Sequence, residues 1–287
     1  MRYQELDGTI HEEETFQDKL LKTLYTTFWG RVILKPLVAP WFSKLSGRFL
    51  DSRLSSWIIK PFIRRNHIDM SPYQKKTYRS YNEFFTREIR KSRRAIDDRQ
   101  EVLVSPCDGK VSVYPLDDHA CFSVKNTMYS TKQLLESEKL ARRFLGGYAV
   151  VIRLSVEDYH HYCYPASGYR SNSYYIPGKF HTVNPIAVET VPVYKQNARE
   201  YTLLKTKEFG TILQMEVGAL MVGKICNLSG EGKVKKGQEK GYFEFGGSTV
   251  ILLLQKDKVV LREQFLRNTK KGIETKIQMG QELGKSQ

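Results

Sequence analysis

A glycine–serine junction near the C-terminal end of the chain is the first feature that could do chemistry. The tetrapeptide Gly246-Gly247-Ser248-Thr249 leads directly into a hydrophobic run. A glycine turn before a strand is the ordinary interpretation. The junction also suits backbone self-cleavage, because Gly247 has no side chain to shield its carbonyl and tolerates unusual φ and ψ angles. The Ser248 hydroxyl can attack that carbonyl to form an ester. Elimination and hydrolysis would then leave a pyruvoyl group at position 248.

A carboxylate in a second turn could assist a base. Asp108 lies between Cys107 and Gly109, directly before an expected strand. An Asp-Gly turn is the structural interpretation. In the functional interpretation, Asp108 orients a histidine, as in nucleophile–base–orienter arrangements.

Two adjacent histidines, His160 and His161, are candidates for that base, in a chain with six histidines. Adjacent residues on a strand point to opposite faces, so we expect one of the two to face a given site. No third ligand follows at a helical or hairpin spacing, so the pair does not predict a metal site. A histidine suits the deprotonation of Ser248 and a later proton transfer at a substrate carbon.

The secondary structure that the sequence predicts changes from helical to mainly β near residue 98. After it, β-rich runs separated by Gly, Pro, Asn and Asp predict short strands. The clearest runs are Tyr148–Leu154, Thr211–Val217, Thr249–Leu254 and Val259–Leu261. We therefore expect an α+β protein with an amphipathic helical N-terminal region, residues 1–98, and a mainly antiparallel β catalytic core, residues 99–287.

The N-terminal region is rich in aromatic and basic residues. Apolar residues recur at helical spacing within residues 16–29, 41–50 and 54–63, which predicts amphipathic helices. Three prolines break the segment into short helices: Pro36, Pro40 and Pro61. A further helix followed by a basic linker is expected around residues 73–94, with the basic sequence KSRR as the solvated end.

All three tryptophans, Trp29, Trp41 and Trp57, lie among these helices, with lysines and arginines between them. Apolar aromatic faces flanked by basic residues are typical of segments that lie in a membrane interface. The alternative is that these faces pack against the protein's own core.

Composition narrows the class of partner. The formal net charge of +15 suits nucleic acid, an anionic membrane or an anionic substrate. Cys107, Cys121, Cys163 and Cys226 form no CxxC pair, which argues against a zinc or redox motif and fits a reducing compartment. The sequence shows no secretory signal and no apolar run of roughly 18 residues that would span a membrane.

Several motifs together resemble the phosphatidylserine decarboxylases of the prokaryotic, pyruvoyl-dependent type. Each motif is modest evidence, but their order is highly specific, and the resemblance covers most of the chain from residue 81 to the end. The segments are Tyr81–Arg90 (YNEFFTREIR), Ser105–Val111 (SPCDGKV), Asp158–Pro165 (DYHHYCYP), Phe180–Pro185 (FHTVNP), Phe209–Ile225 and Lys236–Leu253.

The resemblance implies an inactive precursor, a zymogen, that a charge relay of Asp108, His160 and Ser248 cleaves between Gly247 and Ser248. The products would be a large chain, residues 1–247, and a small chain, residues 248–287. Many members carry a second histidine three residues after the first. Here that position is Cys163. Either His160 serves both reactions, or His161 or Cys163 takes over one; we assign both to His160.

The implied activity is that of a carboxy-lyase acting on phosphatidylserine. The covalent pyruvoyl group derived from Ser248 would form a Schiff base with the substrate amine and act as an electron sink, as pyridoxal phosphate does elsewhere. His160 would donate the proton that yields phosphatidylethanolamine. His181 and Asn184 are candidates for headgroup contacts, with ordinary loop hydrogen bonding as the alternative.

The expected setting is an anionic bilayer, at the cytoplasmic face of the cell membrane, with the N-terminal helices as a peripheral docking surface. A homodimer is left open and no nucleic acid is expected. Three rival functions are a pyruvoyl enzyme for a soluble amino acid, a non-enzymatic membrane or nucleic-acid binder, and a serine hydrolase. The last lacks the GxSxG nucleophile elbow.

Overall fold

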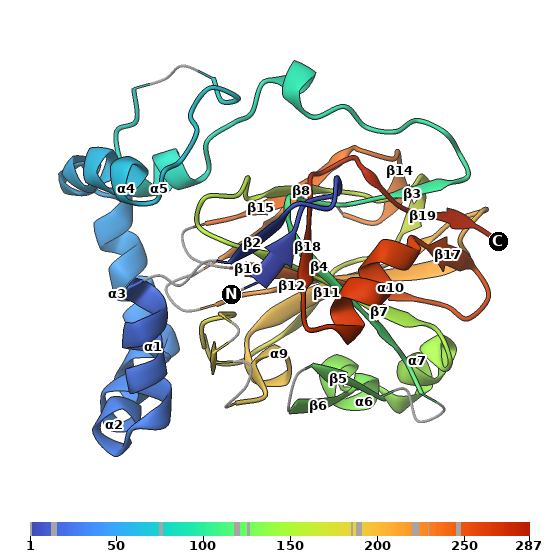
Figure 1. Ribbon diagram of the computed structural model, residues 1–287, viewed down its shortest axis with the longest axis horizontal. Helices are drawn as coiled ribbons and strands as arrows, with labels where there is room; N and C mark the ends of the chain where they lie inside the picture. Colours follow the sequence, from blue (N-terminus) through green and yellow to red (C-terminus); the bar gives the residue numbers. More distant parts are fainter. Residues whose placement is uncertain are drawn as a thin grey trace.

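The computed structural model describes residues 2–12, 16–74, 77–117, 121–124, 127–184, 186–187, 191–219, 224–228, 230–244 and 248–287. Gly247 lies outside the described residues, so the expected cleavage bond is described on its Ser248 side only. The N-terminal helices stand along one side of a β core (Figure 1). The expected α+β class is confirmed.

The core is built on an eleven-stranded sheet in the order β14-β9-β11-β12-β16-β7-β4-β18-β1-β2, with β10 paired to β11. Among the described strands of this sheet, β1 and β18 are the one parallel pair. The strands are β1 (Arg2–Gln4), β2 (Ile10–Glu12), β4 (Gly109–Pro115), β7 (Tyr148–Leu154), β9 (Gly168–Arg170), β10 (Tyr174–Ile176), β11 (Arg199–Lys205), β12 (Thr211–Val217), β14 (Gly232–Val234), β16 (Ser248–Leu254) and β18 (Glu274–Ile277).

Hydrophobic sequence explains why β7 and β16 lie at the centre of this sheet. Every residue of β16 is buried, and so is β7 after Tyr148. A nearly continuous run of apolar residues is typical of a strand that is buried on both faces of its sheet. The four runs predicted as strands are confirmed, with β16 beginning one residue early, at Ser248.

Smaller sheets cover the main one. One has the order β13-β15-β8 and another the order β17-β19-β3, while β5 and β6 form a hairpin. Helix α10 packs on β4 and β18. The elements are β3 (Val102–Val104), β5 (Cys121–Val124), β6 (Thr127–Ser130), β8 (His161–Cys163), β13 (Ile225–Asn227), β15 (Glu239–Phe243), β17 (Val259–Leu261), β19 (Glu282–Ser286), α6 (Thr131–Leu135), α7 (Glu138–Ala141), η3 (Arg142–Phe144), α9 (Val193–Gln196) and α10 (Glu263–Lys270).

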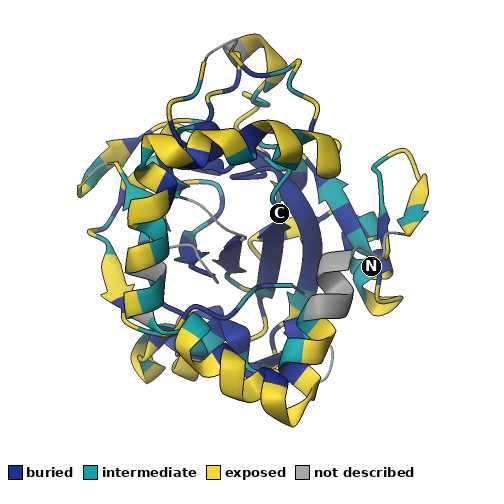
Figure 2. Cartoon of the chain, turned by 90° about the vertical axis from the view of Figure 1, so that its left-hand side faces the viewer, coloured by how far each residue is buried: buried dark blue, intermediate teal, exposed yellow. Residues whose placement is uncertain are grey.

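The helical arm, residues 16–65, frames one side of the core (Figure 2). It consists of α1 (Phe16–Thr26), α2 (Phe28–Leu37), α3 (Pro40–Asp51), η1 (Arg53–Ile58) and α4 (Ile59–Arg65). Thr27 caps α2, since its hydroxyl accepts a hydrogen bond from the Gly30 amide at 3.0 Å. Pro40 opens α3 at the position where a missing amide proton costs nothing. The predicted series of short helices is confirmed. Of the three prolines expected to separate them, Pro40 begins a helix, whereas Pro36 lies inside α2 and Pro61 inside the first turn of α4. No described helix is long and apolar enough to cross a bilayer.

Two expectations about this region differ from the structure. Residues 2–12 belong to β1 and β2 of the main sheet, so the predicted helical region of residues 1–98 begins at Phe16. The helix expected over residues 73–94 is wrong in extent, since only α5 (Tyr81–Phe85) and η2 (Lys91–Arg93) form. The reason is long-range pairing: Tyr73 and Ile89 form a β-bridge that requires extended backbone on both sides of α5.

Candidate active site

Ser248 is the first residue of β16 and pairs with Leu154, the last residue of β7. Its side chain is fully buried, and its Oγ has no hydrogen-bond partner among the residues that the structure describes. A buried hydroxyl without a partner costs about 1–3 kcal/mol. Such groups in native proteins call for a functional or a local structural reason.

His160 lies on the turn that follows β7 and is also fully buried. Neither ring nitrogen has a hydrogen-bond partner within the described part of the chain. The ring packs on Phe85 of α5, with the ring centroids 3.9 Å apart. Burial, reinforced by the positive charge of Arg87, holds the pKa of His160 well below its usual range. The imidazole is therefore neutral and able to accept a proton.

Two connections bring His160 to the end of β16 where Ser248 lies. The turn that carries His160 starts from Leu154, which is the strand partner of Ser248. In addition, the His160 carbonyl accepts a hydrogen bond of 3.0 Å from the amide of Phe243, the last residue of β15, shortly before Ser248 in the chain. A neutral imidazole and an unpartnered hydroxyl at the same end of the sheet have the character of a base and a nucleophile.

Asp108 is buried at the start of β4, where Arg94 binds its carboxylate. Arg94 Nε lies 2.9 Å from Oδ1 and Nη2 lies 2.5 Å from Oδ2, and the Met279 amide donates to Oδ1 at 2.8 Å. No hydrogen bond joins Asp108 to His160 across the described residues, so the orienting role of Asp108 stays a prediction. Arg94 was expected at the solvated end of a basic linker, but its side chain is only 11% exposed. Sequence gives no local signal for this partner.

The turn of Asp108 does contact the strand that follows His160. The amide of Cys163 on β8 donates to the carbonyl of Pro106 at 2.7 Å. Burial raises the pKa of the Cys163 thiol to about 12, so this residue is a neutral thiol and not a thiolate base.

His161 has partners different from those of His160, as the alternation along a strand predicts. Its Nδ1 lies 2.5 Å from Glu239 Oε1 and its Nε2 lies 3.1 Å from the Thr86 carbonyl. The ring stacks on Tyr159 at 4.7 Å. His161, Cys163, Glu239 and Arg94 line a cavity of about 410 Å³. Both nitrogens of His161 are thus engaged away from Ser248.

His181 and Asn184 are engaged in local structure. His181 Nδ1 lies 3.3 Å from the Tyr25 hydroxyl of α1, and burial, reinforced by Lys179, lowers the pKa of His181 to about 4. Asn184 Oδ1 accepts from the Ile186 amide at 3.0 Å. These contacts support loop hydrogen bonding and a link between the helical arm and the core; a headgroup role stays a prediction.

A buried ion pair that sequence reasoning missed lies on the same face of the sheet as Ser248. Lys240 Nζ of β15 lies 2.5 Å from Glu216 Oε2 of β12, with both side chains fully buried, and donates to Asn227 at 2.8 Å. Glu216 pairs with Val250, two residues along β16 from Ser248, so Glu216 and Ser248 are diagonal neighbours, about 7–8 Å apart between strands. The signal in the sequence was Glu216, the one charged residue of the strand Thr211–Val217.

Comparison with known proteins identifies the family of the chain. A profile of the phosphatidylserine decarboxylase family matches residues 81–285. The chain is 43% identical to phosphatidylserine decarboxylase proenzyme 2 of Clostridium acetobutylicum, over 96% of this chain and 95% of the relative. It is 39% identical to a phosphatidylserine decarboxylase proenzyme of Ruminiclostridium cellulolyticum, over 95% and 93%, and 38% identical to one of Fusobacterium nucleatum, over 96% and 94%. The chain belongs to the phosphatidylserine decarboxylase family.

Proposed function

We propose that this protein cleaves its own backbone between Gly247 and Ser248 and then decarboxylates phosphatidylserine to phosphatidylethanolamine and CO2. The observation that carries the proposal is the buried Ser248 hydroxyl, which has no partner within the described ranges, at the same end of the sheet as the buried, neutral His160. The relatives are named as decarboxylase proenzymes, which supports a precursor that must be processed.

In the proposed cleavage, His160 removes the Ser248 hydroxyl proton as the oxygen attacks the Gly247 carbonyl. The peptide C–N bond breaks, the Ser248 nitrogen takes up a proton, and Gly247 becomes an ester of the Ser248 side chain. A base then removes the Ser248 Cα proton, the Cβ–O bond of the ester breaks, and the Gly247 carboxylate leaves a dehydroalanine at position 248. Hydrolysis of its imine form releases ammonia and leaves the pyruvoyl group.

Asp108 acts in this scheme as a positioning residue. Its carboxylate is fixed by Arg94 and by the Met279 amide, and its turn is hydrogen-bonded to β8, the strand that follows His160. Through these bonds Asp108 would hold the His160 segment against the end of β16. A direct contact with a histidine would require Asp108 to exchange its Arg94 partner.

The surroundings of Ser248 fit a pyruvoyl group, because its Oγ at the start of the buried strand β16 has no hydrogen-bond partner among the residues that the structure describes. A pyruvoyl group at position 248 supplies an electron-accepting carbonyl for the loss of CO2. Burial of Ser248 and His160 supports exclusion of water from the site, and in this proposal neutral His160 would move a proton at the substrate carbon. Exclusion of water favours conversion of a charged carboxylate into neutral CO2.

The helical arm is the proposed membrane-docking surface. Trp29 is 74% exposed and Trp57 71% exposed, and Phe28, Trp41 and Leu54 are exposed as well. Outward-facing sides of the helices carry most of the exposed residues (Figure 2). Packing of these aromatic faces on the protein's own core is disfavoured, since large exposed apolar patches mark interaction sites. Exposed basic residues lie between them, each contributing about 1 kcal/mol near an anionic leaflet: Arg31, Lys35, Arg48, Arg53, Lys60, Arg64 and Arg65. We place this surface at the cytoplasmic leaflet.

Intact mass spectrometry tests the cleavage. The purified protein should consist of residues 1–247 and residues 248–287, the latter with a blocked N-terminus that borohydride reduces. Ser248→Ala should stay full length, whereas Thr249→Ser, which keeps the neighbouring hydroxyl, should be cleaved. An active decarboxylase that remains one chain would exclude the proposal. Dependence of the activity on phosphatidylserine vesicles, with no turnover of free serine, separates the lipid substrate from a soluble amino acid.

A further inference from the structure

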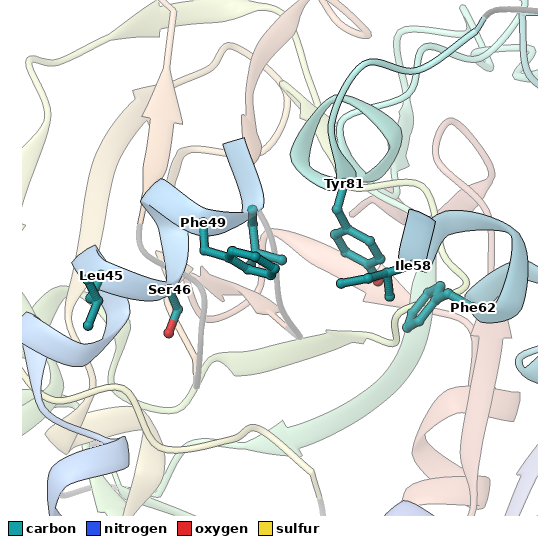
Figure 3. A pocket seen from close by; sticks show the side chains of 7 residues that line it. Leu45, Ser46, Phe49, Ile58, Phe62 and Tyr81 are labelled. Carbon is teal, nitrogen blue, oxygen red and sulfur yellow. The ribbon is translucent and has the colours of Figure 1, made fainter. Parts of the chain in front are cut away.

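An apolar groove opens between the helical arm and α5. Its volume is about 430 Å³, within the range of about 300–1,000 Å³ that is usual for small-molecule sites. In Figure 3, Leu45, Ser46 and Phe49 project from α3, and Tyr81 of α5 lies near Ile58 and Phe62. The arm groove is lined by Leu45, Ser46, Phe49, Leu50, Ile58, Phe62 and Tyr81. Apart from Ser46 and the Tyr81 hydroxyl, every lining side chain is a hydrocarbon.

Helix α5 joins this groove to the candidate active site. Tyr81 lines the groove, and Phe85, four residues later, packs on the imidazole of His160 with the ring centroids 3.9 Å apart. Residues four apart lie on the same face of a helix, with about 5–6 Å between their Cβ atoms. One end of the groove is therefore within about one helical turn of the residue that contacts His160.

Hydrogen bonds fix α5 against the arm. The Tyr81 amide donates to the Ser55 hydroxyl at 2.8 Å, and that hydroxyl donates to the Leu50 carbonyl at 2.8 Å. Asn82 donates to Asp51 at 2.8 Å. The junction of α3 and η1, which forms part of the groove wall, thus also fixes the position of α5.

We infer that the arm groove binds one acyl chain of the phospholipid substrate, with the headgroup directed along α5 toward His160. The inference rests on the proposed function and adds the location at which the enzyme binds the lipid. Hydrocarbon walls select an apolar guest. Leu45 and Phe49 are exposed at the mouth of the groove, as are Trp41 and Trp57 on the membrane-docking surface, so a chain can enter from the bilayer. Nearby Arg48, Arg53 and Lys60 are exposed and suit an anionic lipid.

Chain-length dependence of the purified, processed protein tests the inference. The assay measures kcat/KM for monomeric, short-chain phosphatidylserines whose acyl chains are lengthened step by step. For the natural sequence, kcat/KM should rise by up to about fourfold per methylene that enters the groove. Ser46→Phe fills the groove and should flatten this rise. Phe49→Ala widens it and should extend the rise to longer chains.

The matched control is Ser56→Phe, which places the same side chain on an exposed serine of η1 outside the groove. In the Ser56→Phe protein, kcat/KM should depend on acyl-chain length as it does for the natural sequence. A folded Ser46→Phe protein with an unchanged dependence would overturn the inference, and so would an equal loss in Ser56→Phe. Phe49→Ala supplies an independent answer if Ser46→Phe does not fold.

A second measurement does not depend on activity. Full-length Ser248→Ala protein is irradiated with vesicles that contain phosphatidylserine with a diazirine on one acyl chain, and labelled peptides are mapped. Label on residues 45–62 and on Tyr81, reduced by Ser46→Phe, supports the groove. Label confined to outward residues such as Trp29 shows chains that stay in the bilayer and contradicts it. A change of oligomeric state in Ser46→Phe without a change in labelling would show that a second copy occupies the groove.

The two measurements keep this inference separate from the proposed function. Groove labelling without decarboxylation by the processed protein would retain the acyl site and reject the enzyme. Decarboxylation without chain-length dependence or groove labelling would retain the enzyme and reject the acyl site.

Discussion

Removal of the Lys240 side chain should leave the Glu216 carboxylate buried in the core without its positively charged partner. Lys240 and Glu216 are both fully buried, and Lys240 Nζ lies 2.5 Å from Glu216 Oε2. The change that tests their coupling is Lys240→Met, made in a Ser248→Ala background so that every variant is the same single chain.

The expected magnitude follows from burial. Removing one partner of a buried ion pair costs about 3–5 kcal/mol, because the other charge stays uncompensated. A loss of that size lowers Tm by roughly 10 °C, since about 1 kcal/mol shifts Tm by about 2–4 °C in domains of this size class. The double change Glu216→Leu with Lys240→Met removes both charges and should restore the free energy of unfolding to within about 1 kcal/mol of the parent.

The deficit should also depend on pH. Burial raises the pKa of Glu216, and Lys240 opposes this rise. Without Lys240, the folded pKa of Glu216 lies well above its unfolded value of about 4.3. The protonated carboxyl therefore supports the fold below the unfolded pKa, and this support is lost as pH rises through the folded pKa. The Tm of the Lys240→Met protein should lie close to that of its parent near pH 5, and the difference in Tm should be largest at pH 8.

Thermal unfolding followed by circular dichroism at both pH values measures these differences. Lys276→Met is the matched control, because Lys276 is a half-exposed lysine that also pairs with a glutamate, Glu5. Its loss should cost less than about 1 kcal/mol. A double variant as unstable as Lys240→Met, or a deficit that does not change with pH, would refute the reasoning.

Three further predictions concern the site and the arm. Asp108→Asn should slow self-cleavage by up to about 10⁴-fold if Asp108 contacts the catalytic histidine directly. The effect should be much smaller if Asp108 only holds the His160 segment in position. Mass spectrometry over time measures the cleavage rate, and Asp117→Asn is the control. Because burial lowers the pKa of His160, the base stays unprotonated in acid, so the cleavage rate should hold steady from pH 8 to below pH 6; a fall centred near pH 6.5 would contradict this. Trp29→Ser with Trp57→Ser should weaken sedimentation with phosphatidylserine vesicles and leave Tm unchanged, whereas a lowered Tm would place these side chains in the core.

Local sequence predicted the central elements because their signals are local. Strands β7, β12, β16 and β17 are runs of apolar and β-branched residues, and such runs are recognisable without their partners. The different surroundings of His160 and His161 followed from the alternation of side chains along a strand.

Features that depend on distant partners were not predictable. Strand β1 pairs with β18 at the opposite end of the chain, and three residues carry too little pattern to indicate this. Helix α5 is short because the Tyr73–Ile89 bridge requires extended backbone on both sides of it. Arg87, just after α5, is buried against distant segments: its guanidinium lies 4.3 Å from the Tyr73 ring centroid and 3.0 Å from the Glu157 carbonyl. Arg94 likewise has a buried carboxylate as its partner only through the fold.

The position of β16 in the sheet has a consequence for the lifetime of the protein. The segment 248–287 contributes β16 between β12 and β7, β18 between β4 and β1, and β19 between β17 and β3. After self-cleavage, this fragment would be a separate molecule interwoven with the larger one. Strands β16 and β18 would pair with strands of the larger fragment on both sides, and β19 would pair with it through β3. Heating would release two polypeptides, whose reassembly depends on their concentration. The processed protein would therefore persist by slow unfolding, and each copy would be assembled once, from the intact precursor.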